Sequence, residues 1–214
     1  ERFDAHNFLE KAVAAGAAAL CVERAKAHLA PPGIPLLLSD DTLRSYQLLA
    51  GFHRRRISGV TVFGITGSVG KTSVKEMLRA ICIAAAGSDE KVLWTLENTN
   101  NQIGVPLNLF RLNSDHRFAV LEAGTNHFGE IAYLSDIARP DVAVIINIGT
   151  MHIEHLGSQE GILKAKLEIL EGMHENGKII LNGDDGLLWN QKKSGGRNAI
   201  YFGVRNPECD LKGL

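Results

Sequence analysis

The stretch Val60-Thr61-Val62-Phe63-Gly64-Ile65-Thr66-Gly67-Ser68-Val69-Gly70-Lys71-Thr72-Ser73 decides the fold class of this chain of 214 residues. Its first half is an apolar, β-branched run that predicts a buried strand, and its second half predicts a glycine-rich turn that opens a helix. Glycines in such a turn let backbone N–H groups converge on phosphate oxygens, and a helix N-terminus adds positive charge. The sequence therefore predicts an ATP-binding phosphate loop made of Gly67, Ser68, Val69, Gly70, Lys71, Thr72 and Ser73.

One position of this loop departs from the general phosphate-loop pattern. That pattern has a glycine five positions before the Gly-Lys pair, where this chain has Ile65. The alternative is a glycine-rich turn with a chance Gly-Lys-Thr sequence. Strand, turn, lysine, hydroxyl and helix nevertheless fall in the required order, so that Lys71 can reach the outer phosphates and Thr72 can ligate magnesium.

Outward from the loop, strand patterns alternate with helical patterns. Apolar runs at 92–94, 118–122, 142–146 and 178–181 predict further strands, and helices are predicted at 72–86, 103–112, 130–138 and 159–170. Nearly continuous apolar runs suit strands that are covered on both faces. The alternation predicts an α/β fold with a mostly parallel sheet flanked by helices.

The first quarter of the chain has a different pattern. A helix is predicted at 8–15, strands at 18–23 and 35–38, and a connecting helix at 42–56. We place a domain boundary near residue 58. Residues 1–58 would be the C-terminal part of a small α/β domain, and residues 59–214 would be an incomplete central ATP-binding domain.

Composition excludes several classes of function. The net charge of -1 gives no general electrostatic case for a nucleic-acid or membrane partner. The three scattered cysteines, Cys21, Cys82 and Cys209, argue against a disulfide framework and a structural zinc site. No run approaches the ~20 apolar residues of a membrane span, and the N-terminus lacks signal-peptide features and an initiator methionine. We expect a cytoplasmic protein and a piece of a longer polypeptide.

Several segments, taken in order, resemble the Mur ligase family. The loop Thr66-Gly67-Ser68-Val69-Gly70-Lys71-Thr72 is similar to the loop of that family, although Val69 stands where asparagine or serine is common. The resemblance extends from Phe3 to Gly203, with Ala5 and Leu167 where glycine is expected. The other segments that carry it are 3–8, 98–107, 119–126, 129–131, 139–141, 147–154, 157–158 and 164–169.

The resemblance implies an ATP-dependent reaction that joins a carboxylate to an amine through an acyl phosphate. It is strongest to the family member that adds D-alanyl-D-alanine to UDP-N-acetylmuramoyl-tripeptide in peptidoglycan precursor synthesis, which implies those two substrates, ATP and Mg²⁺. It also implies a third, C-terminal domain that no segment here supplies. We expect the central sheet to stop short after Tyr201-Phe202-Gly203, and we expect the chain to be a monomer that cannot complete the ligation alone.

Glu122 is the first candidate for a metal ligand outside the loop. It ends the predicted strand at 118–122, at the edge where parallel sheets bind ligands. A carboxylate there can hold Mg²⁺ directly or through water. A helix cap or a salt-bridged acid at the rim is the alternative, and the resemblance favours the metal.

The roles of His152 and Lys166 rest on the resemblance. It implies that His152 binds a second metal, whereas the residues alone leave a hydrogen-bonded structural or capping histidine open, because imidazole is not a preferred ligand of magnesium. It implies that Lys166 is carbamylated and so becomes an anionic oxygen ligand. Sequence composition alone favours a solvated lysine beside Lys164. His127 and His155 are expected in surface loops.

Asn98, Asn100 and Asn101 follow the predicted strand at 92–94, on the same edge. They are either turn residues or amide donors that face the muramoyl-peptide or phosphate. Two other functions stay open. One is a sister ligase, either another Mur enzyme or a folylpolyglutamate synthase. The other is a phosphate-loop binding or switch module without ligase chemistry, which would have no use for His152 and Lys166.

Overall fold

A computed structural model describes residues 4–193 and 198–213 of the chain. It divides into two compact units, Glu1–Leu49 and Ala50–Leu214, and each unit is described by itself. This division falls inside helix α2 (Thr42–Arg55), a continuous helix that spans most of the predicted 42–56 segment. The assignment of residues 1–58 to a separate substrate domain stays a prediction, and Phe3 lies outside the described residues.

The first unit contains the predicted pair of strands. β1 (Leu20–Glu23) and β2 (Leu36–Ser39) are parallel, with Leu20 opposite Leu36. They are accompanied by η1 (Ala5–Phe8), α1 (Leu9–Ala14) and η2 (Arg24–Leu29). Leu9, Leu20 and Val22 form its small apolar core.

The second unit is built on one sheet of seven parallel strands. The strand order is β4-β5-β3-β6-β7-β8-β9, which confirms the predicted fold class. The sheet does not stop at Gly203 as expected, because a two-residue strand too short to give a period-two signal pairs with β8. The strands are β3 (Thr61–Thr66), β4 (Val92–Trp94), β5 (Phe118–Glu122), β6 (Val142–Ile145), β7 (Lys178–Asn182), β8 (Ala199–Gly203) and β9 (Leu211–Lys212).

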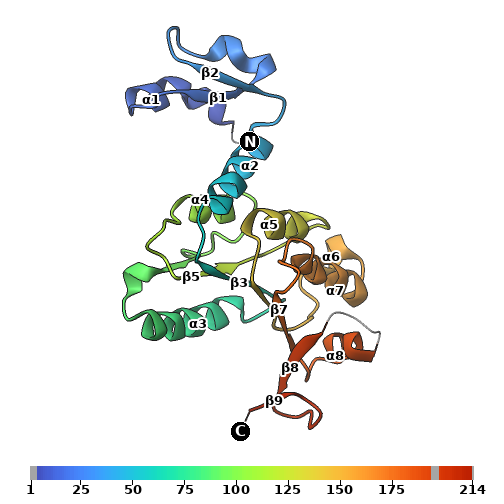
Figure 1. The fold of residues 1–214 in the computed structure, drawn as a ribbon. Coiled ribbons are helices and arrows are strands. Elements are labelled where there is room, and N and C mark those ends of the chain that lie inside the picture. The colour runs from blue at the N-terminus through green and yellow to red at the C-terminus, as the bar shows by residue number, and fades with distance from the viewer. Residues whose placement is uncertain (1–3, 194–197, 214) are drawn as a thin grey trace. The chain divides into compact units, whose positions relative to one another are not determined.

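Helices cover both faces of this sheet (Figure 1). On one face, α3 (Lys71–Ala86) packs Cys82 and Ala86 against Ile65 and Val120. On the other face, α4 (Gly104–Phe110) and α5 (Glu130–Ala138) pack against residues that include Val62. The remaining elements are η3 (Asp89–Lys91), α6 (Ile153–Leu156), α7 (Gln159–Leu167), η4 (Glu168–Leu170) and α8 (Gly186–Lys193). Burial of both faces explains the nearly continuous apolar character of the strands.

The topology brings three strand ends to one edge. β3 lies between β5 and β6, with Ile65 opposite Glu122 and Thr66 opposite Ile145. Because all three strands are parallel, the loops that follow them leave the same edge of the sheet. None of the helices in the described part of the chain has the length and apolar character needed to cross a membrane.

Candidate functional site

The loop between β3 and α3 depends on two glycines with different roles. Gly70 has a φ of 82°, a left-handed conformation that side chains with a Cβ rarely adopt. Gly67 has a φ of 153°, and a Cβ at this position would lie 3.1 Å from the Cβ of Ile146. These glycines let the chain turn from the end of β3 directly into the first residue of α3, Lys71.

Asn147, in the loop after β6, clamps the phosphate loop from the side. Its Oδ1 accepts hydrogen bonds from the amides of Ser68 and Val69, each at 3.0 Å, and its Nδ2 donates to the Val69 carbonyl at 3.0 Å. The Gly149 amide donates to Ser68 Oγ at 2.8 Å. The Ser68 and Val69 amides are therefore already paired with protein, and their predicted contact with phosphate stays a prediction.

The backbone amides that follow in the chain, at the start of α3, are available to bind an anion. Those of Lys71, Thr72 and Ser73, in the first turn of α3, have no hydrogen-bond acceptor among the described residues. Lys71 Nζ folds back and donates to the carbonyls of Gly67 at 2.9 Å and Ser68 at 3.2 Å. Burial lowers the pKa of Lys71, and the nearby charge of Glu122 opposes that shift. A cation and a helix N-terminus thus meet at one point, which is an arrangement that binds phosphate.

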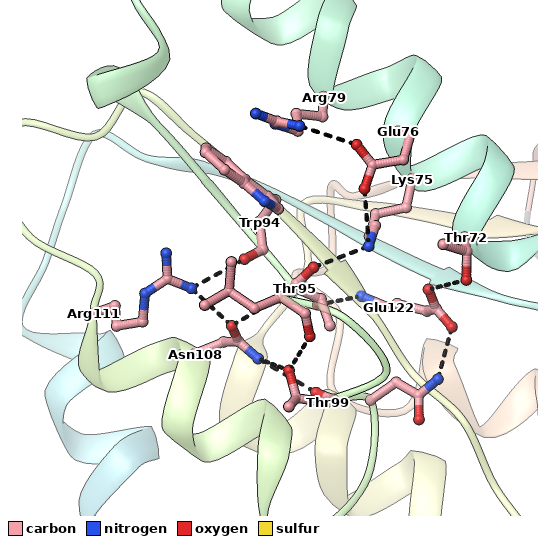
Figure 2. A network of polar contacts seen from close by, with 12 residues as sticks. Thr72, Lys75, Glu76, Arg79, Trp94, Thr95, Thr99, Asn108, Arg111 and Glu122 are labelled. Carbon is pink, nitrogen blue, oxygen red and sulfur yellow. Dashed lines mark hydrogen bonds and ion pairs between the residues drawn. The ribbon is translucent and has the colours of Figure 1, made fainter.

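Glu122, the last residue of β5, faces this helix end from inside the protein. Only 1% of the residue is exposed. Its Oε2 accepts a hydrogen bond from Thr72 Oγ1 at 3.2 Å (Figure 2). Its Oε1 accepts one from Asn100 Nδ2 at 2.7 Å. The Glu122 amide donates to Thr95 Oγ1 at 2.9 Å. Because Glu122 is buried, it is not the exposed, salt-bridged acid at the rim of the sheet that the sequence left as an alternative.

The oxygens of Thr72 and Glu122 fit a magnesium ion. The described residues contain no group of three or more histidine, cysteine, aspartate or glutamate side chains that could hold a metal. Mg²⁺ does not need such a group, since it commonly takes one or two carboxylates and completes its shell with water and substrate phosphates. One carboxylate and one hydroxyl beside free helix amides match that requirement.

Lys166, on α7, is buried rather than solvated. Only 2% of the residue is exposed, and its Nζ makes no hydrogen bond or ion pair within the described part of the chain. Burial lowers the pKa of Lys166 to about 8, helped by the positive charge of Lys71 and opposed by Glu168 and Glu130. The reading of a solvated lysine is therefore wrong, because α7 turns this side chain inward. The neighbouring Lys164 instead lies 5.7 Å from the centre of the Phe128 ring.

Among the described residues, no hydrogen bond or ion pair joins the His152 side chain to Lys71, Thr72 or Glu122. His152 precedes α6 with a φ of 64°, and its carbonyl accepts from the amides of His155 and Leu156, each at 3.1 Å. Its backbone thus caps the helix, while its half-buried side chain has no hydrogen-bond partner in the part of the chain that the structure describes. Its metal role stays a prediction. His127 and His155 are exposed, with ring centres 4.9 Å apart.

The three candidate asparagines have different surroundings. Asn100 contacts Glu122, as described above. Asn101 Oδ1 accepts from the amides of Ile103 at 3.1 Å and Gly104 at 2.9 Å, and so it caps the start of α4. Asn98 is exposed. The sequence pattern gave Asn147 and Thr95 no role, although each lies within two residues of the end of a strand, at the edge of the sheet that carries the site.

The parallel sheet, the loop after β3 and the carboxylate at the end of β5 define a phosphate-loop domain of the α/β class. The family model of the Mur ligase middle domain matches residues 65–213. The chain belongs to the Mur ligase family.

Individual members of that family are similar to this chain in sequence and in structure. The chain is 42% identical over 202 residues to the UDP-N-acetylmuramoyl-tripeptide–D-alanyl-D-alanine ligase of Haemophilus influenzae, covering 94% of this chain and 43% of the relative. A crystal structure of MurF from Acinetobacter baumannii matches with a TM-score of 0.84 and 38% identity, over 95% of this chain and 43% of that one. MurF ligase from Thermotoga maritima in complex with ADP matches with a TM-score of 0.83 and 32% identity, over 96% and 46%. The chain spans less than half the length of these relatives.

Proposed function

We propose that this chain forms the ATP- and magnesium-binding part of a ligase that adds D-alanyl-D-alanine to UDP-N-acetylmuramoyl-tripeptide in peptidoglycan precursor synthesis. The observation that carries the proposal is the meeting of Lys71, Thr72 and Glu122 at the N-terminus of α3. The name of the Haemophilus influenzae relative supports the substrates, and the ADP complex of the Thermotoga maritima relative supports the nucleotide.

The phosphates of ATP would lie on the first turn of α3. Lys71 would exchange the carbonyls of Gly67 and Ser68 for phosphate oxygens, and the amides of Lys71, Thr72 and Ser73 would donate to the same group. Phosphoryl transfer to a carboxylate depends on positioning and charge neutralisation. The Asn147 clamp serves this step because it fixes the loop before the nucleotide binds.

Thr72 and Glu122 would hold the magnesium ion, which would neutralise charge on the phosphate oxygens. His152 and Lys166 would complete a second cation site, with Lys166 carbamylated. Carbamylation requires the neutral amine, which attacks CO₂ and releases a proton to leave an anionic carbamate. The lowered pKa of Lys166 favours that neutral form.

The ligation itself would follow when the amine of D-alanyl-D-alanine displaces phosphate from the acyl phosphate of the tripeptide. The side-chain amides of Asn98, Asn100 and Asn101 are proposed to face the muramoyl-peptide or the phosphate, with Asn100 keeping its hydrogen bond to Glu122. We infer a cytoplasmic monomer that needs a further domain to hold the amine and exclude water. The alternative function, a switch module without ligase chemistry, would not explain why Lys166 is buried beside Lys71.

A chimera tests the proposal. The matching segment of the Haemophilus influenzae ligase is replaced by this chain, and product is measured by mass spectrometry with UDP-muramoyl-tripeptide, D-alanyl-D-alanine, ATP and Mg²⁺. We expect the pentapeptide product from the chimera and none from its Lys71→Ala variant. A folded chimera that hydrolyses or binds ATP but forms no amide would contradict the proposed substrates.

A further inference from the structure

Residues 95–100, between β4 and α4, make two hydrogen bonds to Glu122, and both are shorter than the one from Thr72. We call residues 95–100 the positioning segment. At one end, Thr95 Oγ1 accepts from the Glu122 amide at 2.9 Å. At the other end, Asn100 Nδ2 donates to Glu122 Oε1 at 2.7 Å. The segment therefore fixes both the backbone and one carboxylate oxygen of Glu122, and only the other oxygen is left to face Thr72.

Lys75 of α3 holds the first end of the positioning segment. It is 2% exposed, and its Nζ donates to the Thr95 carbonyl at 3.0 Å and pairs with Glu76 Oε1 at 3.0 Å. The Thr95 amide donates to the Val120 carbonyl at 3.0 Å. The amide, carbonyl and hydroxyl of Thr95 thus each make a hydrogen bond, and these bonds hold this end of the positioning segment in place (Figure 2).

Asn108 of α4 holds the middle of the segment. It is 1% exposed. Its Nδ2 donates to Thr99 Oγ1 at 2.9 Å (Figure 2). The same Nδ2 donates to the Gly104 carbonyl at 2.7 Å, and Oδ1 accepts from the Leu96 amide at 3.3 Å. One buried side chain thus ties both ends of the turn at 96–99 to the helix that follows. A buried polar network whose members are all paired is rigid.

Close packing transmits this rigidity to Asn100. The Asn100 carbonyl accepts from the Gly124 amide at 2.8 Å, and a Cβ on Gly124 would lie 3.0 Å from Asn100 Oδ1. A Cβ on Gly104 would lie 2.5 Å from the carbonyl carbon of Thr99. The turn is therefore closely packed at both glycines, in the conformation in which the Asn100 amide reaches Glu122.

We propose that Asn108 is a positioning residue of this site: it holds the Asn100 amide against Glu122 and so directs the other carboxylate oxygen toward Thr72 and the cation. The role in metal binding rests on the proposed function. The coupling between Asn108 and Glu122 does not, because it is a property of the chain without ligand. A carboxylate held by a neighbour binds a cation without first losing rotational freedom.

The simpler interpretation is that Asn108 only stabilises the fold. Both interpretations predict that Asn108→Ala lowers the melting temperature, so stability does not separate them. If Asn108 is a positioning residue, we expect in addition that its effect on Glu122 depends on the Asn100 side chain. Substitutions at Asn108 and Asn100 should then be non-additive in their effect on the metal.

The first experiment uses NMR on the chain without ligand. We expect the side-chain amide protons of Asn100 to be shifted by the Glu122 carboxylate and to move to the position of a free amide in Asn108→Ala. Asn113→Ala is the matched control, because among the described residues that side chain accepts only from the Asp115 amide, at 3.0 Å, in an exposed turn after α4. If Asn108→Ala does not fold, Thr99→Val removes one hydroxyl of the same turn. Unchanged Asn100 resonances in a folded variant would overturn the inference.

The second experiment measures the Mg²⁺ concentration that half-saturates the ADP complex. We expect Asn108→Ala to raise it by roughly tenfold, as for other residues that orient a metal ligand. In an Asn100→Ala background, the same substitution should add less than about twofold. Independent, multiplying effects would overturn positioning. If the NMR coupling is present but the unaltered chain binds no Mg²⁺ or ADP, the proposed function fails instead, and with it the metal role of Asn108.

Discussion

The Thr72 hydroxyl donates a hydrogen bond of 3.2 Å to the Glu122 carboxylate, and this contact joins the first turn of α3 to the end of β5. The two residues are far apart in sequence and belong to adjacent strand–helix units of the sheet. Each supplies an oxygen of the kind that magnesium prefers. The contact therefore places the candidate cation site directly beside the amides that would hold phosphate.

Replacing Glu122 with glutamine removes the negative charge and keeps the size of the side chain. We expect Glu122→Gln to raise the half-saturating Mg²⁺ concentration by at least about tenfold in the presence of ADP. Glu175→Gln, at an exposed position in the turn before β7, is the matched control and should leave this value unchanged. Calorimetric titration with Mg²⁺ gives the measurement, and equal values for both variants would exclude Glu122 as the ligand.

The burial of Lys166 should make the unfolding free energy of the chain depend on pH in a definite direction. Its pKa is lowered from 10.5 to about 8 in the folded chain, mainly by burial, so the unfolded state binds the proton more tightly. The resulting penalty is fully present below about pH 8 and is lost as the pH rises toward 10.5. At neutral pH it is on the order of 3 kcal/mol.

Lys166→Met removes that penalty. We expect this variant to be more stable than the unaltered chain at pH 7, with the difference shrinking between pH 8 and 10.5. Urea unfolding in buffers free of CO₂ checks this at each pH, since carbamylation would change the charge. A difference that stays constant across this range would show that the ammonium is not penalised by burial.

The fold could be predicted because its signals are local. The strand, glycine turn and helix at 60–86 each have the residues that their conformation requires, and the continuous apolar runs indicate strands covered on both faces. The two-residue β9 is too short to show the alternation of apolar and polar residues that indicates a strand. The division of the chain at Leu49 falls within a continuous helix, where no change in sequence pattern marks it.

The candidate site could be predicted only in part. Lys71, Thr72 and Glu122 follow from the loop and the strand end. The burial of Lys75 and Lys166 could not be predicted, because each lies in a helix among other polar residues and only tertiary packing decides which way it points. Asn101 caps a helix while Asn100 reaches Glu122, and adjacent residues of one type give no sequence signal that separates these roles.

Gly149→Ala tests the packing between the loop and the segment that clamps it. A Cβ at Gly149 would lie 3.1 Å from the Ser68 Cβ, so the phosphate loop must shift. We expect a loss of about 1–3 kcal/mol in unfolding free energy and weaker ADP binding. Gly186→Ala is the control, since a Cβ there meets nothing within 4 Å. Equal behaviour of the two variants would show that the loop does not depend on this contact.

Asn147→Ala tests the clamp itself. Loss of the side chain leaves the Val69 amide without its acceptor, Oδ1, whereas the Ser68 amide keeps the Asn147 backbone carbonyl at 3.1 Å. We expect faster hydrogen exchange at the Val69 amide and a cost of about 1–3 kcal/mol in stability. Asn113→Ala, which removes a side chain from an exposed turn, should change neither. Continued protection of the Val69 amide in the Asn147 variant would mean that another group fixes the loop.

The binding of phosphate at the start of α3 is the central claim, and NMR titration with ADP and Mg²⁺ tests it most directly. We predict that the amide resonances of Lys71, Thr72 and Ser73 shift first and most. Lys71→Ala should weaken binding by roughly 10–100-fold, as for a lost hydrogen bond to a charged group, whereas the surface variant Lys164→Ala should bind like the unaltered chain. Shifts confined to residues away from this turn, or unchanged affinity in a folded Lys71→Ala variant, would contradict the account.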